Sequence, residues 1–182
     1  MIYTEMTPNP ASLKFKVGRT LLPKGSADFP DLSSAKEAPV AKKLFDFKFV
    51  ERVFISSDFI TITKGEDFQW EEVIPVVKDY LKAFFASGQD ALTGTYAEMA
   101  AEGEEEDDEL TQKIKSILET YVRPAVAMDG GDIVYESFNE GVLKVKLQGS
   151  CSGCPSSTLT LKGGIENLLA KMAPEVKAVE AV

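Results

Sequence analysis

The 182-residue sequence contains no histidine and only two cysteines, Cys151 and Cys154. Without histidine, the chain lacks the commonest general base and the commonest transition-metal ligand. Because only two residues separate the cysteines, they do not form the widely spaced disulfide framework that closes long loops in secreted domains. The pair instead favours metal binding or redox chemistry in a reducing compartment.

Long apolar runs and basic clusters are also missing. The longest apolar-rich stretch, residues 73–77, is far shorter than the ~20 residues that cross a bilayer, so we expect no membrane contact. The formal net charge is −9, and residues 102–109 supply seven negative charges and no positive one. The rest of the chain is close to neutral. It lacks a basic surface for phosphates, so nucleic acid is not an expected partner.

The first residues, MIYTEMTP, have neither the apolar core of a secretory signal nor the composition of a transit peptide. We therefore expect a cytoplasmic protein, as for a bacterial-type chain without a targeting peptide. If the chain is a processed form, the mitochondrial matrix is the alternative location.

Residues 1–88 alternate strand and helix signals and predict an N-terminal α/β domain with its own core. Apolar and polar residues alternate over 13–17 and 59–63, which predicts strands. Apolar residues recur every three or four positions from about 68 to 86, which predicts an amphipathic helix. Residues 89–109 contain glycines and the acidic run, and this composition predicts a flexible, solvated linker.

Residues 110–182 predict a second domain with the order helix, strand, strand, helix, strand (α-β-β-α-β). The strand signals lie at 133–138, 143–147 and 176–181, and helical spacing precedes the first strand and follows the second. A helical layer on one sheet face is the expected packing. The fold class is therefore α/β (α+β), with two small two-layer domains joined by an acidic linker.

The chemistry of this chain is expected where the second strand of the C-terminal domain ends. Pro155 suits the first position of the following helix, which places Cys154 near its N-cap. Unpaired N–H groups and the helix dipole there favour thiolate over thiol. The small residues Gly149 and Gly153 leave room for an inorganic centre. Residues 128–132, by contrast, are interpreted as a helix stop and turn.

Two thiolates form only half of a four-ligand shell, and no other cysteine or histidine completes it. A second copy, small thiols or a partner must supply the rest, and a symmetric pair of chains supplies four thiolates. Such a shared site is expected to be exposed. Spacing alone leaves three uses open: an iron–sulfur site, a zinc-binding interaction module and a dithiol–disulfide oxidoreductase. The chain has no further ligands, which makes the zinc-binding module less favoured. The dithiol oxidoreductase is also less favoured, because the 28 residues after Cys154 are few for the rest of a thioredoxin-like sheet.

Two sets of motifs resemble the Nfu-type, or NifU-like, family. Residues 128–132 (MDGGD) and 147–157 (LQGSCSGCPSS) are similar to its C-terminal domain. Residues 7–15 (TPNPASLKF) and 58–64 (DFITITK) are similar to its N-terminal domain. The resemblance covers nearly the whole chain except the linker.

This resemblance implies a non-enzymatic iron–sulfur cluster scaffold or carrier. It implies that Cys151 and Cys154 of two subunits hold a 4Fe-4S cluster, so that the chain is a homodimer when the cluster is bound. It further implies delivery to apo iron–sulfur proteins and contact with upstream cluster assembly factors, with the N-terminal domain helping to recognise them. A 2Fe-2S form and the oligomeric state of the apo chain stay open.

Overall fold

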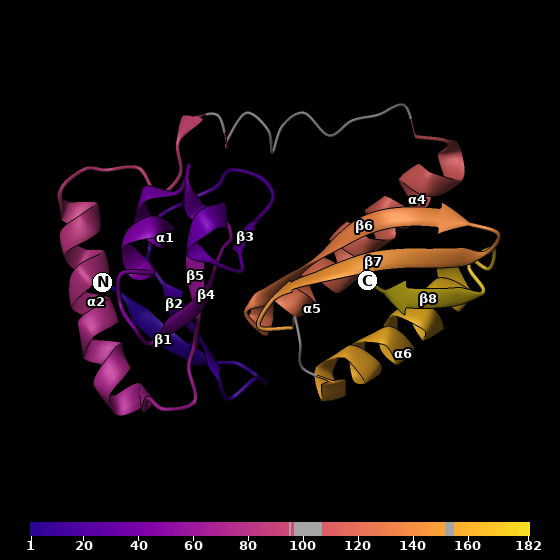
Figure 1. Ribbon diagram of the computed structural model, residues 1–182. Helices are drawn as coiled ribbons and strands as arrows, with labels where there is room; N and C mark the ends of the chain where they lie inside the picture. Colours follow the sequence, from indigo (N-terminus) through magenta and orange to yellow (C-terminus); the bar gives the residue numbers. More distant parts are fainter. Residues whose placement is uncertain (95, 97–106, 152–154) are drawn as a thin grey trace. The chain divides into compact units, whose positions relative to one another are not determined.

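The computed structural model describes residues 1–94, 96, 107–151 and 155–182. The chain divides into two compact units, Met1–Gly103 and Glu104–Val182. Figure 1 shows that each unit has its own sheet and helices. Each therefore has a core of its own, and the two are described separately. No helix in the described part of the chain has the length and apolar character needed to cross a bilayer.

The N-terminal unit is built on a five-stranded antiparallel sheet with the order β1-β2-β5-β4-β3. Its strands are β1 (Tyr3–Met6), β2 (Ser12–Lys16), β3 (Ala27–Phe29), β4 (Val50–Ile55) and β5 (Phe59–Lys64). Its helices are η1 (Leu32–Ala35), α1 (Pro39–Leu44) and α2 (Trp70–Ala86).

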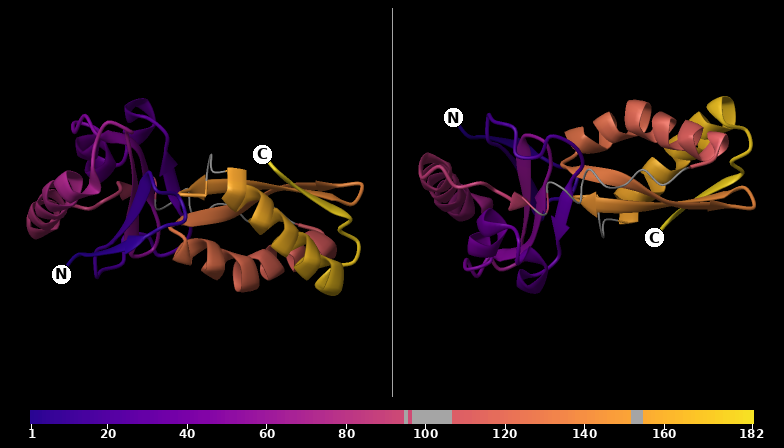
Figure 2. Two further views of the ribbon diagram at one scale, coloured as in Figure 1. Left: turned by 90° about the horizontal axis from the view of Figure 1, so that it is seen from below. Right: turned by 90° about the horizontal axis from the view of Figure 1, so that it is seen from above.

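Helix α2 covers one face of this sheet (Figure 2). Its buried residues follow the expected spacing of three or four: Val73, Val77, Leu81 and Phe84. This periodicity places one apolar stripe against the sheet, which is the arrangement of an amphipathic helix on a core.

The segment after α2 folds onto the N-terminal unit, although the sequence assigned residues 89–109 to a linker. Ala91 and Leu92 are buried in the N-terminal core. The backbone N–H and hydroxyl of Thr93 both donate to the carbonyl of Glu37, at 3.0 and 3.1 Å. Tyr96 packs on Phe29, with ring centroids 5.7 Å apart. Burial of Ala91 and Leu92, the hydrogen bonds of Thr93 and the packing of Tyr96 hold this segment, and none of these contacts produces a local periodic signal.

The C-terminal unit confirms the order helix, strand, strand, helix, strand. One long helical run comprises α4 (Glu109–Ile117), η2 (Leu118–Val122) and α5 (Arg123–Met128). The strands β6 (Gly131–Asn139) and β7 (Val142–Gly149), the helix α6 (Pro155–Met172) and the strand β8 (Ala178–Ala181) follow. The sheet order is β6-β7-β8, antiparallel between β6 and β7 and parallel between β7 and β8. The helices lie on one face of this sheet (Figure 2).

The long helical run widens to π winding over η2. Pro124 explains the change, because proline has no N–H and its ring clashes with the carbonyl four residues earlier in an α-helix. The backbone N–H of Arg123 bonds to the carbonyl of Leu118, five residues back. This wider turn keeps the helix continuous past a proline that, from the sequence, would start a new turn.

Candidate functional site

The two cysteines lie between the end of β7 and the start of α6. Gly149 closes β7 with a φ of 68°, a left-handed conformation that suits glycine and turns the chain away from the strand. Ser150 and Cys151 follow directly, and α6 begins at Pro155. This is the predicted strand-to-helix junction. Cys154 lies outside the described residues.

The side chain of Cys151 is buried, with 4% of its surface exposed, and belongs to the C-terminal hydrophobic core. This differs from the exposed site expected from the sequence. The cause is the close approach of β6: a Cβ atom added to Gly131 would lie 3.0 Å from the Cys151 sulfur. The missing side chain at Gly131 therefore makes the space that the thiol occupies.

The loop 129–131 holds the cysteine segment from the opposite strand. The hydroxyl of Ser150, which is 1% exposed, donates to the carbonyl of Asp129. The backbone N–H of Ser150 donates to the carbonyl of Gly130 at 3.4 Å. Residues 128–132 end a helix, as the sequence predicted. They also shape the site, because they fix the residue that precedes Cys151.

An ion pair between a buried aspartate and a partly exposed arginine anchors this loop to the helical layer. Asp132 is the second residue of β6, and its side chain is 3% exposed. Its two carboxylate oxygens accept from the guanidinium of Arg123, both at 2.8 Å, and one of them also accepts from the N–H of Ile133. The hydrogen bonds to Asp132 raise the pKa of Arg123. The sequence analysis did not predict this ion pair. The one signal for it was an acidic residue, Asp132, at the start of a buried strand.

Within the described residues, no three or more cysteine, aspartate or glutamate side chains gather as a metal site. In the described part of the junction, the group that can bind a soft metal ion is the thiol of Cys151. Soft thiolates suit iron–sulfur clusters and zinc, whereas magnesium and calcium prefer oxygen ligands. The donor chemistry therefore fits a sulfur-bound metal centre that needs further ligands.

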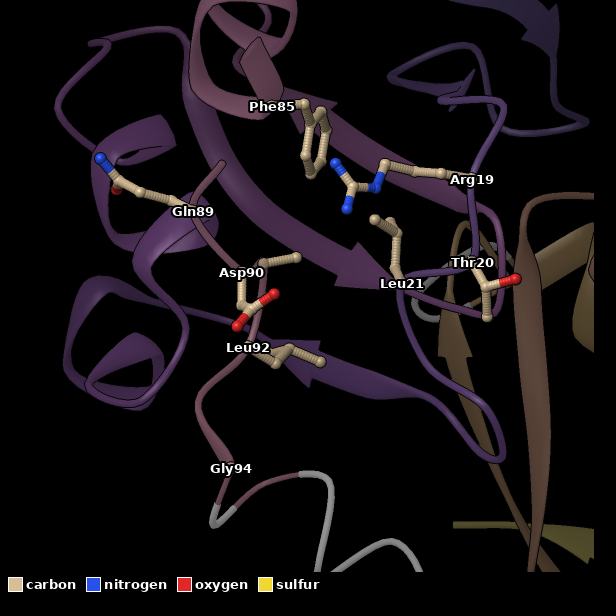
Figure 3. Close-up of a pocket in the computed structure, with 9 residues that line it drawn as sticks. Arg19, Thr20, Leu21, Phe85, Gln89, Asp90, Leu92 and Gly94 are labelled. Carbon is tan, nitrogen blue, oxygen red and sulfur yellow. The ribbon is translucent and has the colours of Figure 1, made fainter. Parts of the chain in front are cut away.

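A separate pocket of about 220 Å³ lies in the N-terminal unit, where residues 89–94 return along the loop at 19–21. Arg19 stacks over the ring of Phe85, 5.3 Å from its centroid. Asp90 lies on the other side of the pocket (Figure 3). The pocket offers one cation, one carboxylate and no thiol, so its chemistry differs from that of the cysteine junction.

Fold and site together define a two-domain α+β protein with one cysteine pair at a strand-to-helix junction. Comparison with family models matches residues 2–88 to the scaffold protein Nfu/NifU N-terminal domain and residues 114–180 to the NifU-like domain. The chain belongs to the Nfu/NifU family of iron–sulfur cluster scaffold proteins.

Individual relatives agree with these matches. The chain is 45% identical to the human mitochondrial NFU1 iron-sulfur cluster scaffold homolog over 182 residues, covering 100% of this chain and 71% of that protein. It is also 45% identical to the mitochondrial NifU-like protein 4 of Arabidopsis thaliana over 183 residues, covering 98% of this chain and 65% of that protein. The chain thus spans about two thirds of the length of these relatives.

A solution NMR structure of a NifU-like protein from Saccharomyces cerevisiae is 28% identical to the chain, with a TM-score of 0.47. The match covers 52% of this chain and 85% of that one.

Both curated relatives are mitochondrial proteins by name. The cytoplasmic location expected from the sequence finds no support in them.

Proposed function

We propose that this chain is a non-enzymatic carrier that holds a 4Fe-4S cluster between two subunits through Cys151 and Cys154. One observation supports this most strongly: a member of a cluster-scaffold family offers two cysteines and no histidine. A tetrahedral thiolate shell needs four ligands, so one chain provides half of it and a second copy completes it. A site shared in this way opens when the subunits part, which favours delivery to apo iron–sulfur proteins.

The burial of Cys151 gives this proposal a conformational step. A sulfur that bridges two subunits must reach the surface, whereas the Cys151 side chain is 4% exposed in the single chain. Cluster binding therefore turns this side chain outward from its place against Gly131. Until then, burial shields the thiol from solvent oxidants, which act on accessible thiolates.

Anaerobic reconstitution of the full chain tests the proposal. With ferric and ferrous iron and sulfide, and without zinc, we expect iron–sulfur absorbance and about two iron and two sulfide per chain. We also expect a shift from monomer to dimer mass. A chain that takes up zinc in a separate sample without sulfide, but no iron and sulfide, would favour the zinc-binding module instead. A cysteine pair that cycles with a disulfide reductase and takes up no iron would favour the dithiol oxidoreductase.

Two variants test the ligands. Cys151→Ser and Cys154→Ser should each fold as the parent chain does and fail to retain a cluster through gel filtration. Retention of a normal cluster by either variant would refute the ligand assignment. Delivery is tested by mixing the loaded dimer with an apo-acceptor that has a vacant 4Fe-4S site and following the acceptor's own spectrum.

We further propose that the C-terminal domain loads the cluster alone and that the N-terminal domain recognises client and assembly proteins. The fragment should begin at residue 107, because Asp108 caps α4 by accepting from the N–H of Thr111 at 3.1 Å. A fragment that starts at 110 loses this cap, at a cost of about 1 kcal/mol. The named relatives support the mitochondrial matrix as the place of action over the cytoplasm.

A further inference from the structure

Ser150 is a buried polar residue at the point where the cysteine segment leaves the sheet. The ladder between β6 and β7 ends at the pair Gly131 and Gly149, and the end of β7 lies beside the start of β6 (Figure 1). Ser150 comes next, with 1% of its surface exposed, and Cys151 follows it directly. The contacts of Ser150 therefore act on the position of the Cys151 side chain.

Two hydrogen bonds tie Ser150 to the loop before the opposite strand. Its hydroxyl donates to the carbonyl of Asp129, and its backbone N–H donates to the carbonyl of Gly130. The loop is itself fixed, because the N–H groups of these two residues donate back into the last turn of α5, both at 3.1 Å. The hydroxyl bond thus joins the cysteine segment to a well-held helix end.

The same hydroxyl also contacts the thiol. Its oxygen lies 4.0 Å from the sulfur of Cys151. A hydroxyl carries one hydrogen and two acceptor lone pairs. Because the hydrogen is donated to Asp129, the oxygen offers a lone pair to the thiol, which is a weak donor. One side chain therefore links the sulfur, in its place against Gly131, to the carbonyl of the opposite loop.

The residue before Ser150 is one that can turn. Gly149 has a φ of 68°, and glycine moves between backbone regions at little cost because it has no Cβ. A rotation at Gly149 that swings the segment outward separates Ser150 from Asp129 and Cys151 from Gly131 together. The hydrogen bonds of Ser150 oppose this rotation.

We propose that the Ser150 hydroxyl is a latch that holds Cys151 in its buried position and sets how often the thiol becomes accessible. Ser150 is a positioning residue in this role, because it acts through Cys151. For cluster uptake the inference rests on the proposed function, in which a sulfur that bridges two subunits first leaves its place against Gly131. Opening of the latch then precedes uptake, so the latch limits the rate of loading and leaves the amount loaded unchanged.

Alkylation of the full apo chain tests the latch without any cluster. All variants carry Cys154→Ser, so that iodoacetamide reports on Cys151 alone. Ser150→Ala removes the hydroxyl, keeps the backbone N–H that binds Gly130 and nearly preserves the side-chain volume. Cys151 should then react about tenfold faster, which is the change expected for the loss of one hydrogen bond.

A matched control separates the latch from a general loss of stability. Ile165→Val removes one buried methylene from the same core and leaves the hydrogen bonds of Ser150 in place. The control exposes Cys151 through global unfolding, which rises steeply with urea. Latch opening is local and exposes little surface, so the reaction rate of Ser150→Ala should stay nearly flat at low urea. Equal rates for the two variants, or the same urea dependence, would overturn the latch.

Loading of chains with both native cysteines tests the effect on uptake. With iron and sulfide, Ser150→Ala should gain iron–sulfur absorbance faster than the parent chain and reach the same cluster content. A variant that exposed Cys151 faster yet loaded at the parent's rate would overturn the inference, as would a fall in its final cluster content. If the parent chain took up no cluster while the alkylation result held, the latch would stand and the carrier function would fall.

Discussion

Gly131 provides the sharpest test of how the site is packed. Gly131 does not have a positive φ, so alanine can adopt its backbone conformation without strain. Space is the obstacle: an added Cβ would lie 2.5 Å from the carbonyl oxygen of Gln148 and 3.0 Å from the sulfur of Cys151. Gln148 is part of β7, so the clash is with the backbone of the strand that leads to the cysteine.

The size of the effect follows from these distances. Ordinary contact lies near 3.5 Å, so β6 and β7 must separate by about 1 Å at this point. Overpacking of this kind costs about 1–3 kcal/mol. Gly164→Ala is the matched control in the same domain, because it lies within α6 and its added Cβ meets nothing within 4 Å. In a helix interior, this change stabilises by about 0.5–1 kcal/mol.

Urea unfolding of the full chain measures both changes. The amide signals of the C-terminal unit should report a lower midpoint for Gly131→Ala and a higher one for Gly164→Ala. Fluorescence of Trp70, the only tryptophan, should report an unchanged midpoint for the N-terminal unit. A Gly131→Ala chain as stable as the parent would refute the close packing of β6 against the cysteine segment. So would an equal shift of the Trp70 transition.

Three further predictions follow from buried groups. Asp132→Asn should destabilise the C-terminal unit by about 2 kcal/mol in urea unfolding, because it removes the charge that binds Arg123; a change within experimental error would show that the pair contributes nothing. In a Cys154→Ser chain, Cys151 should react far more slowly with iodoacetamide than in urea, because it is buried; equal rates would contradict the buried position. Burial raises the pKa of Tyr80, so its contribution to stability is complete below the usual tyrosine value of 10.0 and is lost as pH rises above it. Unfolding at rising alkaline pH should therefore show a loss of stability that is smaller in Tyr80→Phe, where Tyr96, whose pKa burial also raises, still contributes; identical pH profiles would refute the assignment.

Several features of the fold could be predicted from the sequence because their signals are local. The spacing of Val73, Val77 and Leu81 indicated a helix, and the alternation over 143–147 indicated a strand with one wet face. The order of elements in the C-terminal unit followed from such signals in turn. Each depends on residues within a few positions of one another, which periodicity detects.

Other features depend on contacts between distant parts of the chain. The sequence has no signal for the burial of Leu92, since its partners lie in other elements of the N-terminal core. The π winding before Pro124 is likewise a response of the whole helix, which stays continuous because its apolar face is packed on the sheet. Local preference favoured a break there, and tertiary packing outweighed it.

The cysteine junction shows the same division. The sequence by itself determined the ligand count, because two thiols and no histidine make half a site whatever the fold. It also placed the pair between a strand and a helix. Only the tertiary structure decided that Cys151 is buried against Gly131 and that Asp132 and Arg123 lock the neighbouring loop. Both features arise from the pairing of β6 with β7, which brings together residues about 20 positions apart. Neither segment has a local sequence pattern that would predict this contact.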